Sequence, residues 1–206
     1  DTQSNAYHIW TGGDEGVYMS RSIDSGESWE QTSIRISPIE VISTTFPQVD
    51  AGDPGRIAIT YLGSENSSEL GEPDIDGENW TGNAHYATTN VSYHLYITLS
   101  LNALDPSPTF YTYRVTDDPV QIGSICLNSG DCRDIGGSNR NLLDFNDLHI
   151  DREGRVFVAF ADGCTDSCAS DSNSTAEDSR SRRGSVYFLG SGPSLYDSVG
   201  LMEMPF

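Results

Sequence analysis

Residues 22–29, Ser-Ile-Asp-Ser-Gly-Glu-Ser-Trp, separate two stretches in which apolar and polar side chains alternate. Alternation on both sides of a short polar segment predicts two β-strands joined by a tight turn. Asp24 can accept hydrogen bonds from backbone N–H groups of its own loop, and Gly26 permits a positive φ. Trp29 is expected to fold back as an apolar plug under the hairpin. The segment therefore predicts a β-hairpin whose turn is closed by its own side chains.

Similar units recur along the chain. A polar turn at residues 50–55 leads into the apolar stretch 56–63, and a second turn at residues 151–154 leads into a matching stretch, 155–163. Residues 100–110 form a degenerate copy of the 22–29 segment, with Asn102 in place of the aspartate. No stretch has a convincing helical period. Strands are expected at residues 6–11, 16–22, 31–36, 45–49, 56–63, 93–100, 109–115, 141–150, 155–163 and 184–190.

The motif Ser-x-Asp-x-Gly-x-x-Trp, formed by Ser22, Asp24, Gly26 and Trp29, resembles the Asp box, or bacterial neuraminidase repeat. This repeat occurs in sialidase-like β-propellers, and residues 118–126, 139–147 and 158–164 resemble secreted prokaryotic proteins of that type. The resemblance implies an all-β fold, a β-propeller of four-stranded antiparallel blades. The chain would supply about two and a half to three blades of a larger ring, since closed propellers have about four to eight. The approximate blades are residues 1–44, 45–120 and 121–206.

For function, the resemblance implies a secreted protein that binds or processes extracellular or cell-surface glycans, with exo-α-sialidase activity if it is an enzyme. The alternative is a non-catalytic propeller with an adhesive, structural or assembly role. A sialidase uses three arginines to hold the substrate carboxylate, a tyrosine nucleophile and an aspartate acid/base. The Phe/Tyr-Arg-Ile-Pro motif of the first arginine is absent here, and no catalytic residue can be carried over. The implied partners are glycans or glycoproteins, and the remainder of the ring or other chains.

The candidate site residues come from the strand expected at residues 141–150, because the first strand of a blade lines the central funnel. Asp144 and Asp147 can act as an acid/base pair, bind Ca²⁺ through hard oxygens, or cap a turn. No other cofactor is implied. His149, on the same strand, is either a satisfied histidine or part of this site. An arginine cluster at residues 180–183 can hold an anionic sugar or pair with carboxylates. The glycan-binding candidates are Arg140, Asn146 and Arg183.

The charge balance excludes two classes of partner. The chain has 31 acidic and 11 basic residues and a formal net charge of −20, and every basic residue is an arginine. Such a surface repels nucleic acid and anionic membranes. No run of about 18 apolar residues exists to insert into a membrane. A strongly acidic surface without lysine suits high salt, where charges are screened, so a halophilic source is expected.

The opening residues, 1–5, indicate a mature or cut N-terminus.

Four cysteines occur as two close pairs, and the expected disulfides are Cys126–Cys132 and Cys164–Cys168. Three connectivities are formally open, and metal binding is the competing interpretation, although the spacings are not those of a zinc ribbon. Disulfides indicate an oxidising compartment, and hence a secreted or cell-surface protein. Four Asn-x-Ser/Thr sequons agree with secretion and glycosylation. They begin at Asn66, Asn79, Asn90 and Asn173.

Overall fold

The computed structural model describes residues 1–12, 16–65, 84, 91–123, 125, 142, 146–170 and 183–197, and the backbone of residues 201–203. Over this part of the chain the fold is almost entirely β, and the only helix there is the four-residue α1 (Ser167–Ser170). All strand pairs are antiparallel, and no sheet within the described residues closes on itself. The all-β class expected from the alternating pattern is therefore confirmed. Within the described residues, no helix is long and apolar enough to cross a membrane.

Three sheets contain most of the strands. Sheet 1 consists of β1 (Ala6–Thr11), β2 (Val17–Ser22) and β3 (Ile34–Arg35). Sheet 2 consists of β4 (Ser43–Ala51), β5 (Ile57–Ser64), β6 (Ser92–Ser100) and β7 (Tyr111–Arg114), with β8 (Gln121–Ile122) paired to the start of β6. Sheet 3 consists of β9 (Asn146–Ile150), β10 (Val156–Asp162) and β11 (Arg183–Phe188). A small hairpin follows, made of β12 (Ser191–Pro193) and β13 (Leu201–Glu203).

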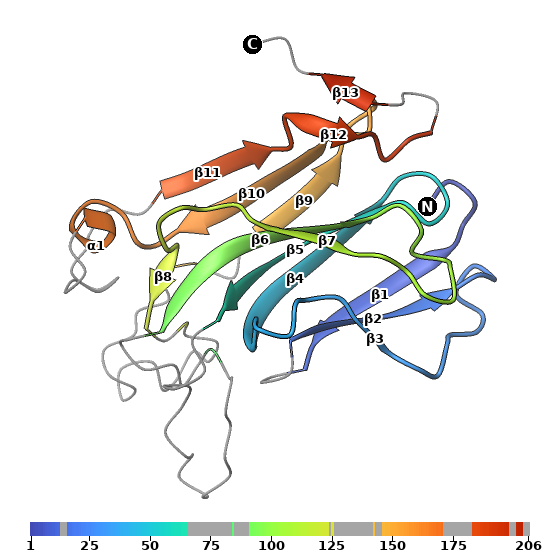
Figure 1. Cartoon of the computed structure of the whole chain (residues 1–206), viewed down its shortest axis with the longest axis horizontal. Helices are drawn as coiled ribbons and strands as arrows, with labels where there is room; N and C mark the ends of the chain where they lie inside the picture. Colours follow the sequence, from blue (N-terminus) through green and yellow to red (C-terminus); the bar gives the residue numbers. More distant parts are fainter. Residues whose placement is uncertain are drawn as a thin grey trace, which may run out of the picture.

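Sheet 2 lies between the other two sheets. In Figure 1, sheet 3 is above it and sheet 1 below it, and β1 and β9 both contact β4. Successive residues of a strand point to opposite faces of the sheet. Each central strand of sheet 2 therefore presents one set of apolar side chains to sheet 1 and another set to sheet 3. The core between sheets 1 and 2 includes Met19 and Ile59, whereas the core between sheets 2 and 3 includes Leu95 and Val158. Both faces of sheet 2 are thus buried.

Three turns with one geometry introduce equivalent strands of the three sheets. They span residues 1–5, 52–56 and 151–155, and in each the main-chain nitrogen of the first residue donates to the carbonyl oxygen of the fifth at 2.9 Å, this nitrogen being the terminal ammonium in Asp1. The fourth residue has a positive φ, which favours glycine. It is Ser4 (65°), Gly55 (77°) or Gly154 (78°). The strands that follow these turns, β1, β5 and β10, therefore occupy equivalent positions.

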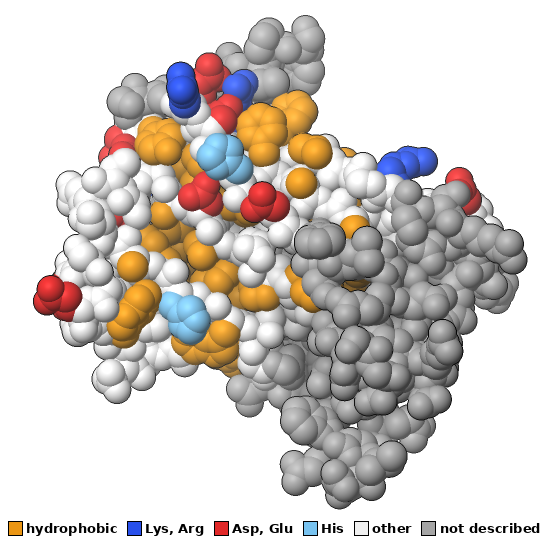
Figure 2. Space-filling view, turned by 180° about the vertical axis from the view of Figure 1, so that it is seen from behind, with side chains coloured by type: hydrophobic (Ala, Val, Ile, Leu, Met, Phe, Trp, Pro, Cys, Tyr) orange, Lys and Arg blue, Asp and Glu red, His pale blue; other side chains and the backbone are white. Residues whose placement is uncertain are grey.

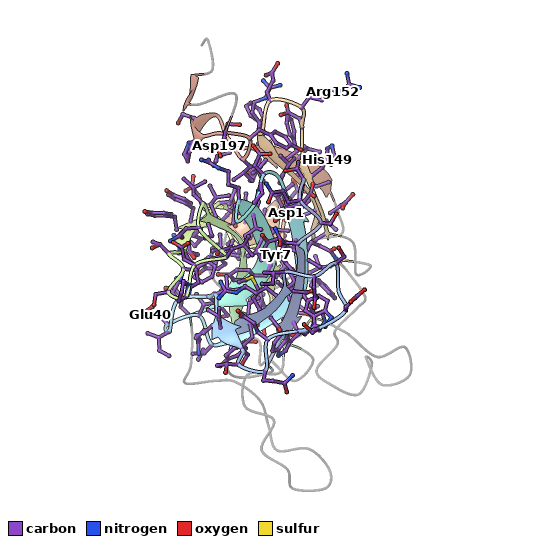
Figure 3. The ribbon with its side chains drawn as sticks, turned by 90° about the vertical axis from the view of Figure 1, so that its right-hand side faces the viewer. Asp1, Tyr7, Glu40, His149, Arg152 and Asp197 are labelled. Carbon is purple, nitrogen blue, oxygen red and sulfur yellow. A yellow bond between two sulfur atoms is a disulfide. The ribbon has the colours of Figure 1, made fainter. Side chains whose placement is uncertain are left out.

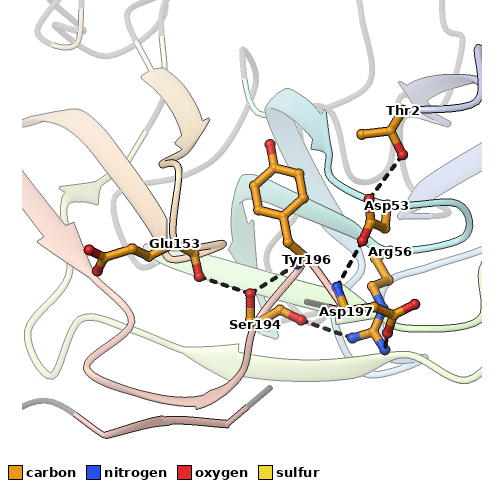
Figure 4. Close-up of polar contacts among 7 residues, drawn as sticks. All are labelled: Thr2, Asp53, Arg56, Glu153, Ser194, Tyr196 and Asp197. Atoms are coloured by element: carbon orange, nitrogen blue, oxygen red, sulfur yellow. Dashed lines mark hydrogen bonds and ion pairs between the residues drawn. The ribbon is translucent and has the colours of Figure 1, made fainter. Parts of the chain in front are cut away.

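The segment 194–197 joins the turns of sheets 2 and 3 (Figure 4). Leu195 N donates to Gly154 O at 3.1 Å, and Leu195 O accepts from Asp53 N at 2.9 Å. Arg56 donates to Ser194 O at 2.9 Å and pairs with the Asp197 carboxylate. The segment approaches so closely that a Cβ at residue 154 would lie 1.9 Å from Ser194 Oγ, so glycine is required there.

A corresponding contact occurs in sheet 2, where Ala103 N donates to Gly55 O at 2.8 Å. Residues 102–105 therefore pack on the 52–56 turn as residues 194–197 pack on the 151–155 turn. The match between the two turns that the sequence predicts thus extends to their packing partners.

Two parts of the structure differ from the sequence-based expectations. The short strands β8, β12 and β13 and the helix α1 are not predicted, because elements of two to four residues leave no periodic pattern. Trp29 is not a buried plug: its side chain is 39% exposed and touches the edge of the His8 ring, with the ring centroids 6.1 Å apart. The outer face of sheet 1, where these rings lie, is not covered by any described segment, so nothing buries Trp29.

Candidate functional site

Three strand ends of sheet 3 bring polar side chains together. Asp162 is the last residue of β10 and faces Arg183, the first residue of β11, across the ladder. Asn146, the first residue of β9, faces Phe160 in the same ladder. Because neighbouring strands are antiparallel, the start of β9, the end of β10 and the start of β11 meet at one edge. We call Asn146, Asp162 and Arg183 the sheet 3 end site.

The pKa of the Asp162 carboxyl is raised, mainly because the group is half-buried. The nearby Asp118 carboxylate raises it further, while a hydrogen bond from Cys164 N at 3.0 Å and the charge of Arg183 lower it. Asp118 belongs to the loop before β8, and this loop is held against sheet 3 by Gly163 N, which donates to Val120 O at 2.9 Å. Burial thus favours the protonated, hydrogen-donating form of Asp162.

Asn146 adds an amide to this site. Its Nδ2 atom is buried, and no described residue accepts a hydrogen bond from it. A buried donor without an acceptor costs about 1–3 kcal/mol. Arg183 is exposed at the same edge and presents a guanidinium to solvent. The site therefore combines a carboxyl, an amide and a guanidinium, which together donate and accept hydrogen bonds.

A disulfide fixes the chain just after Asp162. Cys164 and Cys168 are bonded, with their Cα atoms 5.1 Å apart, and both are buried. The helix α1 contains the second cysteine, so the disulfide anchors this turn beside the end of β10. The local pairing expected for Cys164 and Cys168 is confirmed. Cys126 and Cys132 lie outside the described residues.

Asp147 and His149 lie on the opposite face of β9 from Asn146, as the strand alternation requires. Asp147 is exposed and its Oδ1 accepts from Leu148 N at 2.9 Å, while His149 Nδ1 lies 3.5 Å from Asp50 Oδ2. The same Asp50 oxygen accepts from Ile150 N at 2.8 Å, so Asp50 ties β4 to β9. Figure 3 places His149 on the side of the molecule away from Glu40, the side that Figure 2 faces.

The expected cluster of Arg140, Asp144, Asn146 and Asp147 can be located only in part. Asn146 and Asp147 project from opposite faces of β9, so the structure separates them although they are adjacent in sequence. Asp144 and Arg140 lie outside the described residues. Among the described residues, no group of three or more His, Cys, Asp or Glu side chains is arranged to hold a metal ion.

The turn at residues 22–29 is held by its own side chains. Ser22 Oγ accepts from Gly26 N at 2.9 Å and donates to Asp24 Oδ1 at 2.7 Å, and Ser28 N donates to Asp24 Oδ1 at 2.8 Å. Gly26 has a φ of 89°. The hydrogen bond from the Ser28 hydroxyl, followed by that from Ser22, lowers the pKa of Asp24 to about 2. The turn follows β2 in sheet 1 and lies apart from the sheet 3 end site.

Four of the described arginines hold parts of the fold together and are not free to bind a ligand. Arg21 donates to the carbonyl oxygens of Ala103 and Asp105, which belong to the segment after β6. The other three bind carbonyls or carboxylates in the same manner. They are Arg35, Arg56 and Arg155. An arginine triad that could hold a sugar carboxylate is therefore not available from these four side chains.

The remaining predicted site residues lie outside the described residues. These are Asn66, Asn79, Asn90, Asn173, Arg180 and Arg182. The sequence predicts Asn146 and Arg183 as site residues but not Asp162 or Asp118. A signal for Asp162 was present, since it ends an apolar strand two residues before a cysteine of a close pair. Asp118 could not be found from sequence, because only the packing of its loop on sheet 3 brings it near.

No family model, no curated protein and no solved structure matches this chain.

Proposed function

We propose that this chain is part of a secreted β-propeller of the Asp-box type, and that it binds neutral glycans at the sheet 3 end site without catalysing their hydrolysis. The observation that carries the binding proposal is the convergence of Asn146, Asp162 and Arg183 at one edge of sheet 3. Carboxyl, amide and guanidinium groups are suited to the vicinal hydroxyls of a sugar, which both donate and accept hydrogen bonds.

Two features support the propeller arrangement. The three sheets repeat one turn geometry and one strand register, and such repeated antiparallel units are typical of propellers. The 22–29 turn has the internal hydrogen bonds that an Asp box needs, from Ser22 through Asp24 to Ser28. The disulfide Cys164–Cys168 supports an oxidising, extracellular location.

Charge favours a neutral sugar over a sialic acid. Arg183 lies near the Asp162 carboxyl, which in turn lies near Asp118, within a chain of formal net charge −20. Bringing an anionic sugar to this site would oppose the surrounding field. Four other arginines are engaged in structural contacts, as described above. Binding through hydroxyl groups avoids this electrostatic cost.

Glycoside hydrolysis is the second candidate, and one observation favours it. The raised pKa of Asp162 keeps a proton on this carboxyl to higher pH than usual, which is the property required of a general acid. In that case Asp162 would give its proton to the leaving-group oxygen as the glycosidic C–O bond breaks, water would add to the anomeric carbon, and a proton from that water would restore the carboxyl. The two candidate functions predict different effects of Asp162→Asn. An amide keeps the shape of the side chain but cannot act as an acid, so the variant would lose hydrolysis while it still binds the sugar.

The experiment combines calorimetric titration with neutral oligosaccharides and sialyllactose and an assay with fluorogenic glycosides, including a sialoside. We expect a neutral oligosaccharide to bind, and Arg183→Ala to weaken its binding by roughly tenfold, about 1.4 kcal/mol. Arg152→Ala is the matched control, since Arg152 is an exposed arginine in the 151–155 turn at the other end of β10. It should leave binding unchanged.

The outcomes separate the candidates. Turnover that Asp162→Asn abolishes while oligosaccharide binding persists would replace binding by hydrolysis as the function. A preference for sialyllactose over every neutral sugar would overturn the choice of ligand. Equal losses of oligosaccharide affinity in Arg183→Ala and Arg152→Ala would overturn the assignment of binding to the sheet 3 end site.

A further inference from the structure

No described segment covers the outer face of sheet 1 or of sheet 3, whereas both faces of sheet 2 are covered. The shared turns give the correspondence between strands: residue 6 follows the first turn as residues 57 and 156 follow the other two. By this count Trp10 corresponds to Tyr61, and Phe157 corresponds to Ala58. The uncovered faces can therefore be compared, position by position, with the buried faces of sheet 2.

The outer face of sheet 1 corresponds to the face of sheet 2 that receives sheet 1. Trp10 faces Tyr18 across the β1–β2 ladder, as Tyr61 faces Tyr96 across the β5–β6 ladder. Both pairs are stacked, with ring centroids 6.2 Å apart for Trp10–Tyr18 and 5.5 Å apart for Tyr61–Tyr96. The tyrosine pair is buried between sheets, whereas His8, Trp10, Tyr18 and Trp29 form a partly exposed aromatic patch.

The outer face of sheet 3 corresponds to the face of sheet 2 that receives sheet 3. Phe157 faces Phe188 across the β10–β11 ladder, as Ala58 faces Leu99 across the β5–β6 ladder. Leu99 is 4% exposed, whereas Phe188 is 50% exposed, and Val186 beside it is also exposed. On β10 and β11, sheet 3 thus presents to solvent apolar side chains at positions that sheet 2 uses to hold its next neighbour.

We propose that the outer face of sheet 1 in one copy of this chain docks on the outer face of sheet 3 in a second copy, in the manner in which the sheets pack within one copy. This contact would repeat an interface that the molecule already makes twice, between sheets 1 and 2 and between sheets 2 and 3. It rests on the ring arrangement proposed above, not on the sugar-binding site.

A second copy of the chain is the expected partner, because each chain carries both halves of this interface, on opposite sides of sheet 2. Such a head-to-tail contact closes into a ring when the rotation between subunits permits it. Two copies give six sheets, which lies within the range of about four to eight found in closed propellers. The pairing also covers Trp29, and so accounts for an exposed tryptophan in a motif where a buried one is expected.

The charge of the chain makes the association dependent on salt. Two copies with a formal net charge of −20 each repel one another at low ionic strength. The screening length falls from about 30 Å at 0.01 M to about 3 Å at 1 M salt. The dimer should therefore form in molar NaCl and dissociate in dilute buffer.

The experiment is a mass measurement by sedimentation or light scattering of the chain over a range of NaCl concentrations. In molar salt we expect twice the 22.4 kDa mass of one chain. Tryptophan emission should shift to shorter wavelength in step with the mass, because Trp10 and Trp29 become buried. A mass of one chain at every salt concentration would overturn the proposal, whatever the sugar titrations give.

Two variants test the head-to-tail geometry. His8→Glu places a charge on the outer face of sheet 1, and Val186→Glu places one on the outer face of sheet 3. Both side chains are exposed in one copy, so the fold should tolerate them. Each variant alone should raise the dissociation constant by roughly tenfold or more. A mixture of the two should recover dimer, because the intact sheet 3 face of one variant can bind the intact sheet 1 face of the other.

Ile39→Glu is the matched control: it adds the same charge at another exposed apolar residue, in the loop after β3. It should dimerise like the unaltered chain. Dimerisation of Val186→Glu at the unaltered affinity would indicate a contact between two identical faces and would overturn the head-to-tail arrangement. A mixture that dimerises no better than the single variants would overturn it as well. Circular dichroism of each variant establishes that the fold is retained.

Discussion

Sheets 1, 2 and 3 share one pattern of turns and strands. Corresponding side chains are nevertheless buried in sheet 2 and partly exposed on the outer faces of sheets 1 and 3. Tyr61 and Trp10 occupy corresponding positions and each stacks on a tyrosine of the next strand. Tyr61 is fully buried because sheet 1 covers it, whereas Trp10 keeps part of its surface in water. Position within a strand therefore decides the direction of a side chain, and the neighbouring sheet decides its burial.

The largest difference should appear when the two corresponding rings are removed. Tyr61→Ala deletes a buried aromatic ring and leaves a cavity, which costs about 3–5 kcal/mol of unfolding free energy. Trp10→Ala removes a partly exposed ring and should cost about 1 kcal/mol or less in dilute, low-salt buffer, where the chain is monomeric. Urea unfolding of both variants measures the two losses. Equal losses would show that sheet 1 does not cover Tyr61 in solution.

A smaller difference is expected between two arginines that connect sheets. The Arg21 side chain is 6% exposed and reaches carbonyl oxygens of the segment after β6, whereas Arg56 is 21% exposed and pairs with an exposed Asp197. Arg21→Ala leaves buried carbonyls without donors and should cost about 2–3 kcal/mol. Arg56→Ala breaks a partly exposed pair and should cost about 1 kcal/mol or less.

The same urea titrations check this prediction. A loss for Arg56→Ala as large as that for Arg21→Ala would show that the contact between sheets 2 and 3 depends on this ion pair as strongly as the contact between sheets 1 and 2 depends on Arg21.

The smallest effects concern the pH dependence of two aspartates, one on sheet 1 and one on sheet 3. The pKa of Asp24 is lowered in the folded chain from the ordinary 3.8 to about 2, so its stabilising contribution is present above pH 3.8 and is lost as pH falls toward 2. The pKa of Asp162 is raised by burial, so its contribution has the opposite sign: it is present at low pH and is lost as pH rises above 3.8.

Thermal unfolding between pH 2 and pH 6 distinguishes the two groups. Asp24→Asn should flatten the loss of stability at the acid end, because an amide does not titrate there. Asp162→Asn should reduce the loss of stability that occurs as pH rises above 3.8. At pH 6 this variant should be as stable as the unaltered chain or more stable. A change of the same sign in both variants would contradict the opposite environments of these two carboxyl groups.

Much of the strand framework could be predicted from the sequence, because period-two alternation fixes which residues share a face. The central strands β5, β6 and β10 were expected within about two residues of their observed bounds, as is usual for boundaries set by pattern alone. The disulfide Cys164–Cys168 was also expected from its spacing. The sheet 3 end site was found only in part, since Asn146 and Arg183 were candidates but Asp162 was not. The pKa of Asp162 is raised by burial and by the charge of Asp118, a residue more than forty positions earlier that only the packing of its loop brings near.

The turns and the side-chain directions follow from the sequence alone, since both depend on local chemistry. The hydrogen bonds from Ser22 through Asp24 to Ser28 form within one short segment, and the glycines at 55 and 154 meet a local requirement for a positive φ. Burial and neighbourhood are set by the tertiary fold alone: Trp29 is exposed, and Asp118 lies near Asp162. These features depend on how sheets pack against one another, which brings together residues that no local pattern connects.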